Sequence, residues 1–373
     1  MEPASILGII IVAVRCAAPI CPIPGIDSLT DAINTEARTG VRHALEPQGD
    51  IAETAPIGNA ARDVVCTLAE GSYFHGLAAL TNSLVAAGFK GSIVVGYRGS
   101  KPPWLGKLDK DGTLDSFLVA PEVRLQLVEV PGPWHLANYK GHLMQKVFVE
   151  IVPDADLVYF FDTDIVIKHS WDTFAAWARH GVVLVLDVAD SYMSPHHVYR
   201  RAWRALAAKQ DRKCRDFTGY VNSGCVGINR VYAEFAEVWS LLMEQLARDG
   251  ADMQEMKNLT GPLEFSRMDQ DVLNVTVMAT DAPIALLGSE AMGFFPYTGA
   301  VMPHATFQKK PWSRNYILDA LRGLPPSRSY LAYWEFVDDP IRPFSRLELR
   351  KKKIQVAIAR LIGLLHSRSS RDL

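Results

Sequence analysis

The sequence predicts an α/β fold: a mostly parallel central sheet with helices on both faces, followed by an amphipathic C-terminal helix. Three observations predict it. Short, strongly apolar runs alternate with stretches of helical spacing, as expected for parallel strands buried on both faces. Polar residues follow directly on several of these runs, at the strand ends where such sheets bind ligands. The C-terminal stretch combines helical periodicity with a high density of positive charge.

Buried strands are predicted wherever a short apolar run is bounded by polar or turn residues. A first helix is predicted over 73–87, because Leu77, Leu80 and Leu84 recur at helical spacing and Gly88 provides a C-terminal stop. A second helix is predicted over 143–151, followed by a proline that marks its end. The predicted strands lie at 64–68, 93–97, 125–130, 157–161, 182–186 and 226–228.

Composition limits the class of protein. The chain has 373 residues, of which 49% are hydrophobic and 21% charged, and this excludes a mainly disordered or fibrous protein. Its formal net charge of −2 argues against a dedicated nucleic-acid binder, which would be strongly basic. The five cysteines include no CxxC pair, so a disulfide framework or a zinc ribbon is not expected. We therefore expect an enzyme-sized protein in a reducing compartment, the cytoplasm.

The chain divides into three parts by composition. Residues 1–60 are rich in Pro, Gly, Ala, Asp and Thr without periodicity, and we expect a poorly ordered lead-in there. Its apolar stretch, 5–14, is too short to span a membrane, whereas a weak secretory signal stays open as an alternative. Residues 61–312 carry the strands and motifs and are predicted to form the main domain. Residues 313–373 are predicted to form a basic tail.

The tail contains a helical pattern over 344–366 that places several apolar residues on one face. Residues 342–373 also hold nine basic and only two acidic residues. A basic amphipathic helix of this kind favours the surface of an anionic membrane, which would make the protein peripheral. The alternative is a helix that docks on the protein's own core with its charges solvated. The apolar face consists of Leu347, Ile354, Ile358, Leu361 and Leu365.

The strongest local signal is the pair Asp162 and Asp164, which follows the very apolar run 157–161. Two carboxylates separated by one residue at a strand end can both reach one cation. Hard divalent ions such as Mg²⁺ and Mn²⁺ take oxygen ligands of this kind. A solvated acidic loop is the alternative for the pair taken alone.

Three further motifs are weak in isolation. Each has an ordinary structural explanation: a loop-to-strand junction, acidic residues that complement a helix dipole, and a histidine satisfied by its surroundings. Asp187 and Asp190, which follow the run 182–186, are weaker candidates for holding a hydroxyl group of a ligand, and helix capping or loop solvation is the alternative. The three motifs are Asn222 in Asn-Ser-Gly, the pair Asp269 and Gln270, and His304 with Lys310-Pro311-Trp312 six residues later.

Together and in this order, the four motifs resemble those of glycosyltransferase family 8, whose members are retaining sugar transferases of the GT-A fold with a Rossmann-like nucleotide-binding half. The resemblance covers residues 62–312. It implies that Glu70 and Ser72 lie near the uridine of a UDP-sugar and that Tyr73 stacks on its base. The ligands that it implies for Mn²⁺ or Mg²⁺ are Asp162, Asp164 and His304.

The same resemblance implies a catalytic group in which Asn222 lies in the donor-sugar pocket. Asp269 and Gln270 are then expected beside the reacting carbon. Lys310 is expected to contact the diphosphate.

Two positions depart from the family pattern. Phe307 stands where the family has a glycine, three residues after the histidine, and this puts a close backbone approach to the diphosphate in doubt. The arginine that usually contacts the diphosphate upstream of the DxD pair is absent. Gln145 and Lys146 are the residues at hand, and we choose Lys146 for this contact.

The resemblance implies a metal-dependent enzyme that transfers a hexose from a UDP-sugar to a saccharide, lipid-linked or protein acceptor. A nucleotidyltransferase that makes sugar nucleotides shares the sheet and the metal carboxylates, but it needs a Gly-rich basic loop that residues 68–73 lack. A glycoside hydrolase would use two carboxylates and would leave the uridine-site motif unexplained. A non-catalytic protein that binds nucleotide sugar at the membrane is the remaining alternative.

Overall fold

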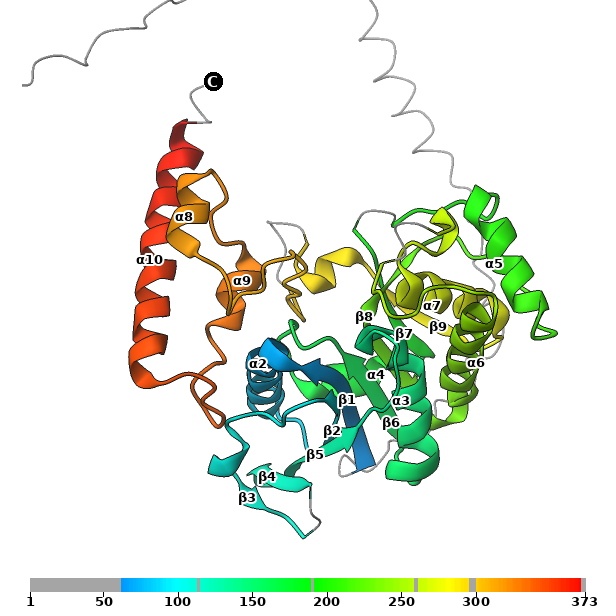
Figure 1. Ribbon diagram of the computed structural model, residues 1–373, viewed down its shortest axis with the longest axis horizontal. Helices are drawn as coiled ribbons and strands as arrows, with labels where there is room; N and C mark the ends of the chain where they lie inside the picture. Colours follow the sequence, from blue (N-terminus) through cyan, green and yellow to red (C-terminus); the bar gives the residue numbers. More distant parts are fainter. Residues whose placement is uncertain (1–61, 113–114, 189–190, 258–260, 295–299, 370–373) are drawn as a thin grey trace, which may run out of the picture. The chain divides into compact units, whose positions relative to one another are not determined.

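Nine strands form one central sheet in the computed structural model of the chain (Figure 1). The structure describes residues 62–112, 115–188, 191–257, 261–294 and 300–369, all within the unit Thr54–Leu373; the predicted lead-in, 1–60, lies outside them. The strands are β1 (Asp63–Glu70), β2 (Gly91–Arg98), β3 (Asp109–Lys110), β4 (Ser116–Ala120), β5 (Val123–Glu129), β6 (Leu157–Phe161), β7 (Val182–Leu186), β8 (Val221–Asn229) and β9 (Ile284–Leu287). Their order across the sheet is β3-β4-β5-β2-β1-β6-β8-β7-β9.

Helices cover both faces of this sheet, as predicted. One face carries α3 (Lys140–Lys146), α5 (Val198–Ala208), α6 (Glu234–Arg248) and α7 (Met268–Ala279), and the other carries α2 (Phe74–Ala86) and α4 (Trp171–Trp177). Val64 of β1 belongs to the first core layer and Val65 to the second. Successive side chains of a strand point to opposite faces, so a continuous apolar run serves both layers.

The strands β5-β2-β1-β6 are parallel, which confirms the predicted centre of the sheet. Strand β8, however, runs antiparallel to both β6 and β7. Because of this reversal, the beginning of β8 lies beside the carboxyl end of β6, with Cys225 paired to Phe161. Residues that enter β8 therefore meet residues that leave β6 at one edge of the sheet.

Two predicted boundaries were wrong. Asn222, expected in a junction before a strand, lies inside β8, because Asn274 of α7 exchanges two hydrogen bonds with the backbone of Val221 and pairing with β7 continues past it. The helix expected over 143–151 begins at Lys140, and its second half, Val147–Ile151, is a π-helical turn. In both cases the element begins earlier than predicted. Its first residues include a polar one, Asn222 in β8 and Lys140 in α3.

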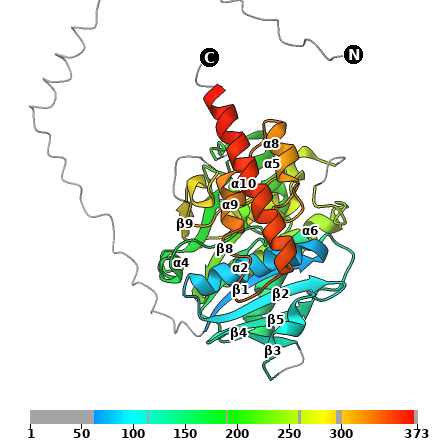
Figure 2. The ribbon, with the colours of Figure 1, turned by 90° about the vertical axis from the view of Figure 1, so that its left-hand side faces the viewer.

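The C-terminal segment folds onto α2 through a third apolar cluster. It contains α8 (Tyr316–Leu321), α9 (Arg328–Tyr333) and the long helix α10 (Arg346–Ser369), which lies along α8 in both views (Figures 1 and 2). From α10 this cluster takes Leu349, Val356 and Ala359, and from α2 it takes Ala79. Helix α10 therefore docks on the protein's own body, which was the alternative to a free membrane helix.

The apolar face predicted for this helix is not the face that docks. Its five residues, Leu347, Ile354, Ile358, Leu361 and Leu365, are 40% to 68% exposed. Helix α10 thus has two apolar faces, one buried against the protein and one open to solvent. Among the described residues, no helix is long and apolar enough to cross a membrane.

Asn82 ties α2 to the chain's C-terminal part. Its buried side-chain amide donates to the carbonyls of Phe336 and Ile341 at 2.8 Å each and accepts from the Ile341 amide at 2.9 Å. We predict that Asn82→Ala lowers the free energy of unfolding by about 3 kcal/mol, because it leaves buried backbone groups unpaired. Asn229→Ala, which removes one exposed cap, should cost about 1 kcal/mol or less. Equal shifts in the melting temperature of the two variants would show that Asn82 does not stabilise the contact between α2 and the C-terminal part.

Candidate functional site

Asp162 and Asp164 stand on a turn that the sheet fixes from several sides. Thr67 of β1 donates its hydroxyl to the Phe161 carbonyl at 2.6 Å, and the Asp162 amide donates to the Gly224 carbonyl of β8 at 2.9 Å. The amide of Ile165 then closes the turn by donating to the Asp162 carbonyl at 3.0 Å. Because these hydrogen bonds fix the backbone of residues 161–165, both carboxylates lie at the carboxyl end of β6.

His304 reaches the same place through backbone pairing. Ile165 and His304 form an isolated antiparallel bridge, and the amide of Ala305 donates to the Asp164 carbonyl at 3.0 Å. The two segments are about 140 residues apart, and Nε2 of His304 lies 3.1 Å from Oδ1 of Asp164. The DxD turn and the histidine are thus brought together by main-chain geometry as well as by their charges.

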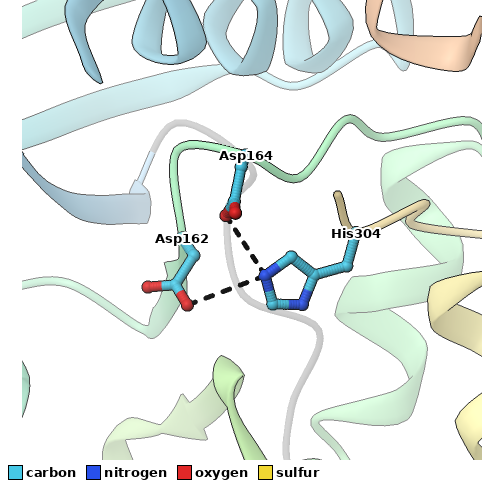
Figure 3. Close-up of side chains that lie close together, drawn as sticks. All are labelled: Asp162, Asp164 and His304. Carbon is cyan, nitrogen blue, oxygen red and sulfur yellow. Dashed lines mark hydrogen bonds and ion pairs between the residues drawn. The ribbon is translucent and has the colours of Figure 1, made fainter. Parts of the chain in front are cut away.

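One ligand atom from each of Asp162, Asp164 and His304 lies within 4.8 Å of the others (Figure 3). A side-chain carbon at Gly224 would come within 2.6 Å of the imidazole ring and 3.1 Å of the Asp162 carboxylate, so a glycine is required beside the group. Carboxylates suit Mg²⁺ and Mn²⁺, whereas imidazole favours transition metals. The donor set therefore fits a divalent cation and favours Mn²⁺ over Mg²⁺.

Two lysines contact this group, the buried Lys140 at Asp162 and the half-buried Lys310 at Asp164. Lys310 donates to Oδ2 of Asp164 at 2.6 Å. Burial alone would raise the pKa of Asp164, but His304 and Lys310 outweigh it and hold this pKa well below its ordinary value. For Asp162, burial raises the pKa and Lys140 only partly offsets the effect. The two acids of one turn are thus unequal in their tendency to ionise.

Lys140 is the second of these lysines. Its Nζ lies 3.0 Å from Oδ1 of Asp162 and 2.9 Å from Oδ2 of Asp269, and it donates to the backbone carbonyl and hydroxyl of Ser223. Burial would lower the pKa of Lys140, but the two carboxylates raise it above the ordinary value. Lys140 therefore joins the DxD turn to α7 as a charged group.

Lys146, which we chose from the sequence for the diphosphate contact, does not line the pocket. It is largely exposed and pairs with Glu150 one helical turn further on, at 3.7 Å. The cation on this helix that reaches the site is Lys140. A signal was present: Lys140, Leu143 and Met144 share one helical face and are all buried. We missed it because the predicted helix began three residues too late.

Further side chains of the site come from the beginning of β8 and the first turn of α7. They are Asn222, Asp269 and Gln270. Asn222 donates to Oδ2 of Asp187 at 2.9 Å, and Gln270 donates to the same oxygen at 3.3 Å. Ser223 donates its hydroxyl to Asp269 at 2.7 Å. The beginning of β8 and the first turn of α7 are thus joined by side chains. Asp187, a weaker candidate in the sequence, holds both amides, whereas Asp190 lies outside the described residues.

These groups line one pocket of about 270 Å³ together with the end of β1. Glu70 and Tyr73 contribute to its wall, and Tyr73 meets the ring of Trp312 edge-on at 5.6 Å. Ser72 is exposed and does not line the pocket, but it accepts a hydrogen bond from the indole N–H of Trp312 at 3.4 Å. The first and last motifs of the sequence are therefore in direct contact.

Apart from Lys140, the lining residues that the sequence did not indicate carried no sequence signal. His135 lies in the turn before α3, and its Nδ1 accepts from the Ala137 amide, which leaves Nε2 as the N–H of the neutral ring. Segment 253–257 lies beside this turn, because the Met253 carbonyl accepts hydrogen bonds from the His135 amide and from the Asn138 side chain. Phe307 itself is 65% exposed and is not part of the lining. The residues missed are Lys140, His135, Met256, Lys257, Arg267 and Thr306.

Lys140 and Lys146 provide a matched pair for testing this charge network. We predict that Lys140→Met lowers the free energy of unfolding by about 3 kcal/mol, since it leaves the buried Asp269 and the partly buried Asp162 without their shared cation. Lys146→Met removes an exposed pair and should cost less than about 1 kcal/mol. Thermal unfolding of both variants measures the difference. Similar melting temperatures would contradict the assignment of Lys140 to the network.

Comparison with known proteins gives structural likeness only. The sequence matches no protein-family model and no curated protein. The fold is similar to the galactosyltransferase LgtC, solved with donor and acceptor sugar analogues, at 16% identity and a TM-score of 0.47 over 78% of this chain and 99% of that one. It is also similar to the bifunctional glycosyltransferase WbbM, at 16% identity and a TM-score of 0.46 over 80% of this chain and 52% of that one. Both proteins are glycosyltransferases, the class that the sequence motifs resemble.

Proposed function

We propose that the chain is a metal-dependent glycosyltransferase that transfers a hexose from a UDP-sugar to an acceptor hydroxyl, with retention at the sugar carbon. The observation that carries this proposal is the convergence of Asp162, Asp164 and His304 beside Lys310, in a pocket that also contains Tyr73. A diphosphate needs cationic partners, a base needs an aromatic surface, and a sugar needs several fixed polar groups. The lining of this pocket includes cationic, aromatic and fixed polar side chains.

The diphosphate would be the leaving group, so negative charge grows on its oxygens as the bond from sugar to phosphate breaks. A divalent ion held by the two aspartates and His304 would stabilise that charge as a Lewis acid. Lys310 adds a positive charge at the same place. Burial tends to lower the pKa of Lys310, but Asp164 raises it above its ordinary value, so the side chain stays charged. Such a preorganised charge stabilises the transition state without further rearrangement.

The sugar side of the pocket is polar and rigid. Asp187 holds the side-chain amides of Asn222 and Gln270, and Lys140 with Ser223 holds Asp269. Groups fixed in this way can bind the hydroxyls of the donor hexose without losing conformational freedom at the moment of binding. We assign them the positioning of the donor sugar beside the acceptor hydroxyl.

The metal site makes the first prediction of this function. UDP release from UDP-hexoses, measured without acceptor, should require Mn²⁺ or Mg²⁺ and stop in EDTA. Asp162→Ala, Asp164→Ala and His304→Ala should each lower the rate about a thousandfold or more, because each removes stabilisation of the leaving group. Glu150→Ala changes an exposed carboxylate of the π-helical turn that follows α3, outside the pocket lining, and serves as control. Full turnover in EDTA, or in the Asp164→Ala protein, would refute the proposal.

We further propose that α10 binds the surface of an anionic membrane. With about 100° between successive residues, Leu347, Ile354 and Leu361 fall on the side of the helix opposite to the buried Leu349 and Val356. Arg350 and Lys351 border this apolar stripe, and Arg346, Lys353 and Arg360 are exposed further around the helix. An apolar stripe bordered by positive charge matches the boundary between acyl chains and anionic headgroups. Membrane contact would bring the enzyme to lipid-linked or envelope-bound acceptors.

Introducing negative charge into the apolar stripe tests whether α10 binds a membrane surface. The full chain should sediment with vesicles that contain anionic lipid, and less so at high salt. The double variant Leu361→Glu/Leu365→Glu should remain in the supernatant because it replaces apolar contacts with repelled charges. Val198→Glu changes an equally exposed apolar residue on α5 and should sediment like the wild type. If the stripe variant partitions like the control, α10 has no membrane role.

A further inference from the structure

Lys310 extends from a short segment whose backbone is held by side chains from the C-terminal helices. Tyr330 of α9 donates its hydroxyl to the Lys309 carbonyl at 2.6 Å, and Tyr316 of α8 donates to the Pro311 carbonyl at 3.0 Å. Ser313 donates its amide to the carbonyl of Lys310 itself at 3.0 Å. Three successive carbonyls are therefore fixed around the lysine that contacts Asp164.

The bond to Lys309 acts on Lys310 directly. The Lys309 carbonyl and the Lys310 amide belong to one planar peptide group, so holding this oxygen fixes the plane from which the Lys310 side chain starts. On the other side, the ring of Pro311 restricts its own backbone, and Tyr316 holds the peptide that follows. A long side chain such as that of Lys310 has several rotatable bonds, and anchoring its base reduces the volume that the ammonium group explores.

The two tyrosines are buried and oriented by their own neighbours. Both have no measurable exposure, and Trp334 donates its indole N–H to the Tyr316 hydroxyl at 2.7 Å. Because that oxygen already accepts a hydrogen bond, its own hydrogen is directed to the Pro311 carbonyl. Both rings belong to the apolar cluster that α10 completes with Leu349 and Val356. A hydroxyl placed in such surroundings costs free energy unless it is bonded, so each of these bonds has few alternatives.

We propose that Tyr330 and Tyr316 are positioning residues of the diphosphate site: Tyr330 holds the peptide that precedes Lys310, Tyr316 holds the peptide that follows Pro311, and together they set where the Lys310 ammonium group stands. This role rests on the proposed function, in which Lys310 contacts the donor diphosphate. It gives the C-terminal segment a part in substrate binding, although neither tyrosine lines the pocket.

Single hydroxyl deletions test the positioning role. Tyr330→Phe and Tyr316→Phe keep the rings and remove one bond each, and Tyr333→Phe is the matched control, because Tyr333 is an equally buried residue of α9 whose hydroxyl donates to His75 instead. Binding of UDP with Mn²⁺ is measured by calorimetry, and binding of uridine, which has no phosphate, by ligand-observed NMR. We expect about a fivefold loss of UDP affinity in the two test variants and no loss of uridine affinity. Tyr333→Phe should bind both ligands like the wild type.

The outcomes separate this role from the proposed function. A wild-type protein that binds no UDP contradicts the function itself. A wild-type protein that binds UDP, with Tyr330→Phe and Tyr316→Phe unchanged, overturns the positioning role alone. Equal losses for UDP and uridine would show general structural damage and would also overturn it, as would an equal loss of UDP affinity in Tyr333→Phe.

Discussion

Asp162, Asp164 and Asp269 bring three carboxylates to one end of the sheet, where burial strengthens their mutual repulsion. Lys140, between Asp162 and Asp269, and Lys310, on Asp164, provide the opposing charge. Removing either partner of such a pair leaves a buried charge without compensation, which is more costly than the pair is favourable. The placement of α3 and of the C-terminal segment is therefore constrained by the need to deliver one lysine each to this edge.

The backbone meets this requirement through two connections distant in sequence. The reversed direction of β8 places Asn222 and Ser223 beside the end of β6, and the bridge between Ile165 and His304 places the closing motif against the DxD turn. The carbonyls of Lys309 and Pro311 accept hydrogen bonds from tyrosines of α9 and α8, and these tyrosines belong to one apolar cluster with α10. In this arrangement the docked side of α10 supports the site, while its other side remains open for the membrane surface proposed above.

The sequence predicted those features that depend on local pattern. Neighbouring residues were enough to predict the strand before Asp162 and the helix over 73–87, and the structure has both elements. They also indicated a group of Asp162, Asp164 and His304, which the structure brings together. Lys140 was missed because its helix begins three residues before the predicted start, and the partners that hold Lys140, Asp162 and Asp269 among them, are distant in sequence. The reversal of β8 depends on pairing across the chain. The docked face of α10 could not be distinguished from the exposed one because both faces are apolar, and only contact with the tyrosine cluster decides between them.

Binding of Mn²⁺, followed by electron paramagnetic resonance with and without UDP, tests the central claim most directly. If Asp162, Asp164 and His304 form the cation site, the wild-type protein binds Mn²⁺, UDP tightens this binding, and Asp164→Asn abolishes it. The Asn side chain keeps the shape of Asp164 and removes its charge, and a circular dichroism spectrum like that of the wild type shows that the loss does not come from unfolding. Equal Mn²⁺ binding by the wild type and by Asp164→Asn, unaffected by UDP, would contradict the account.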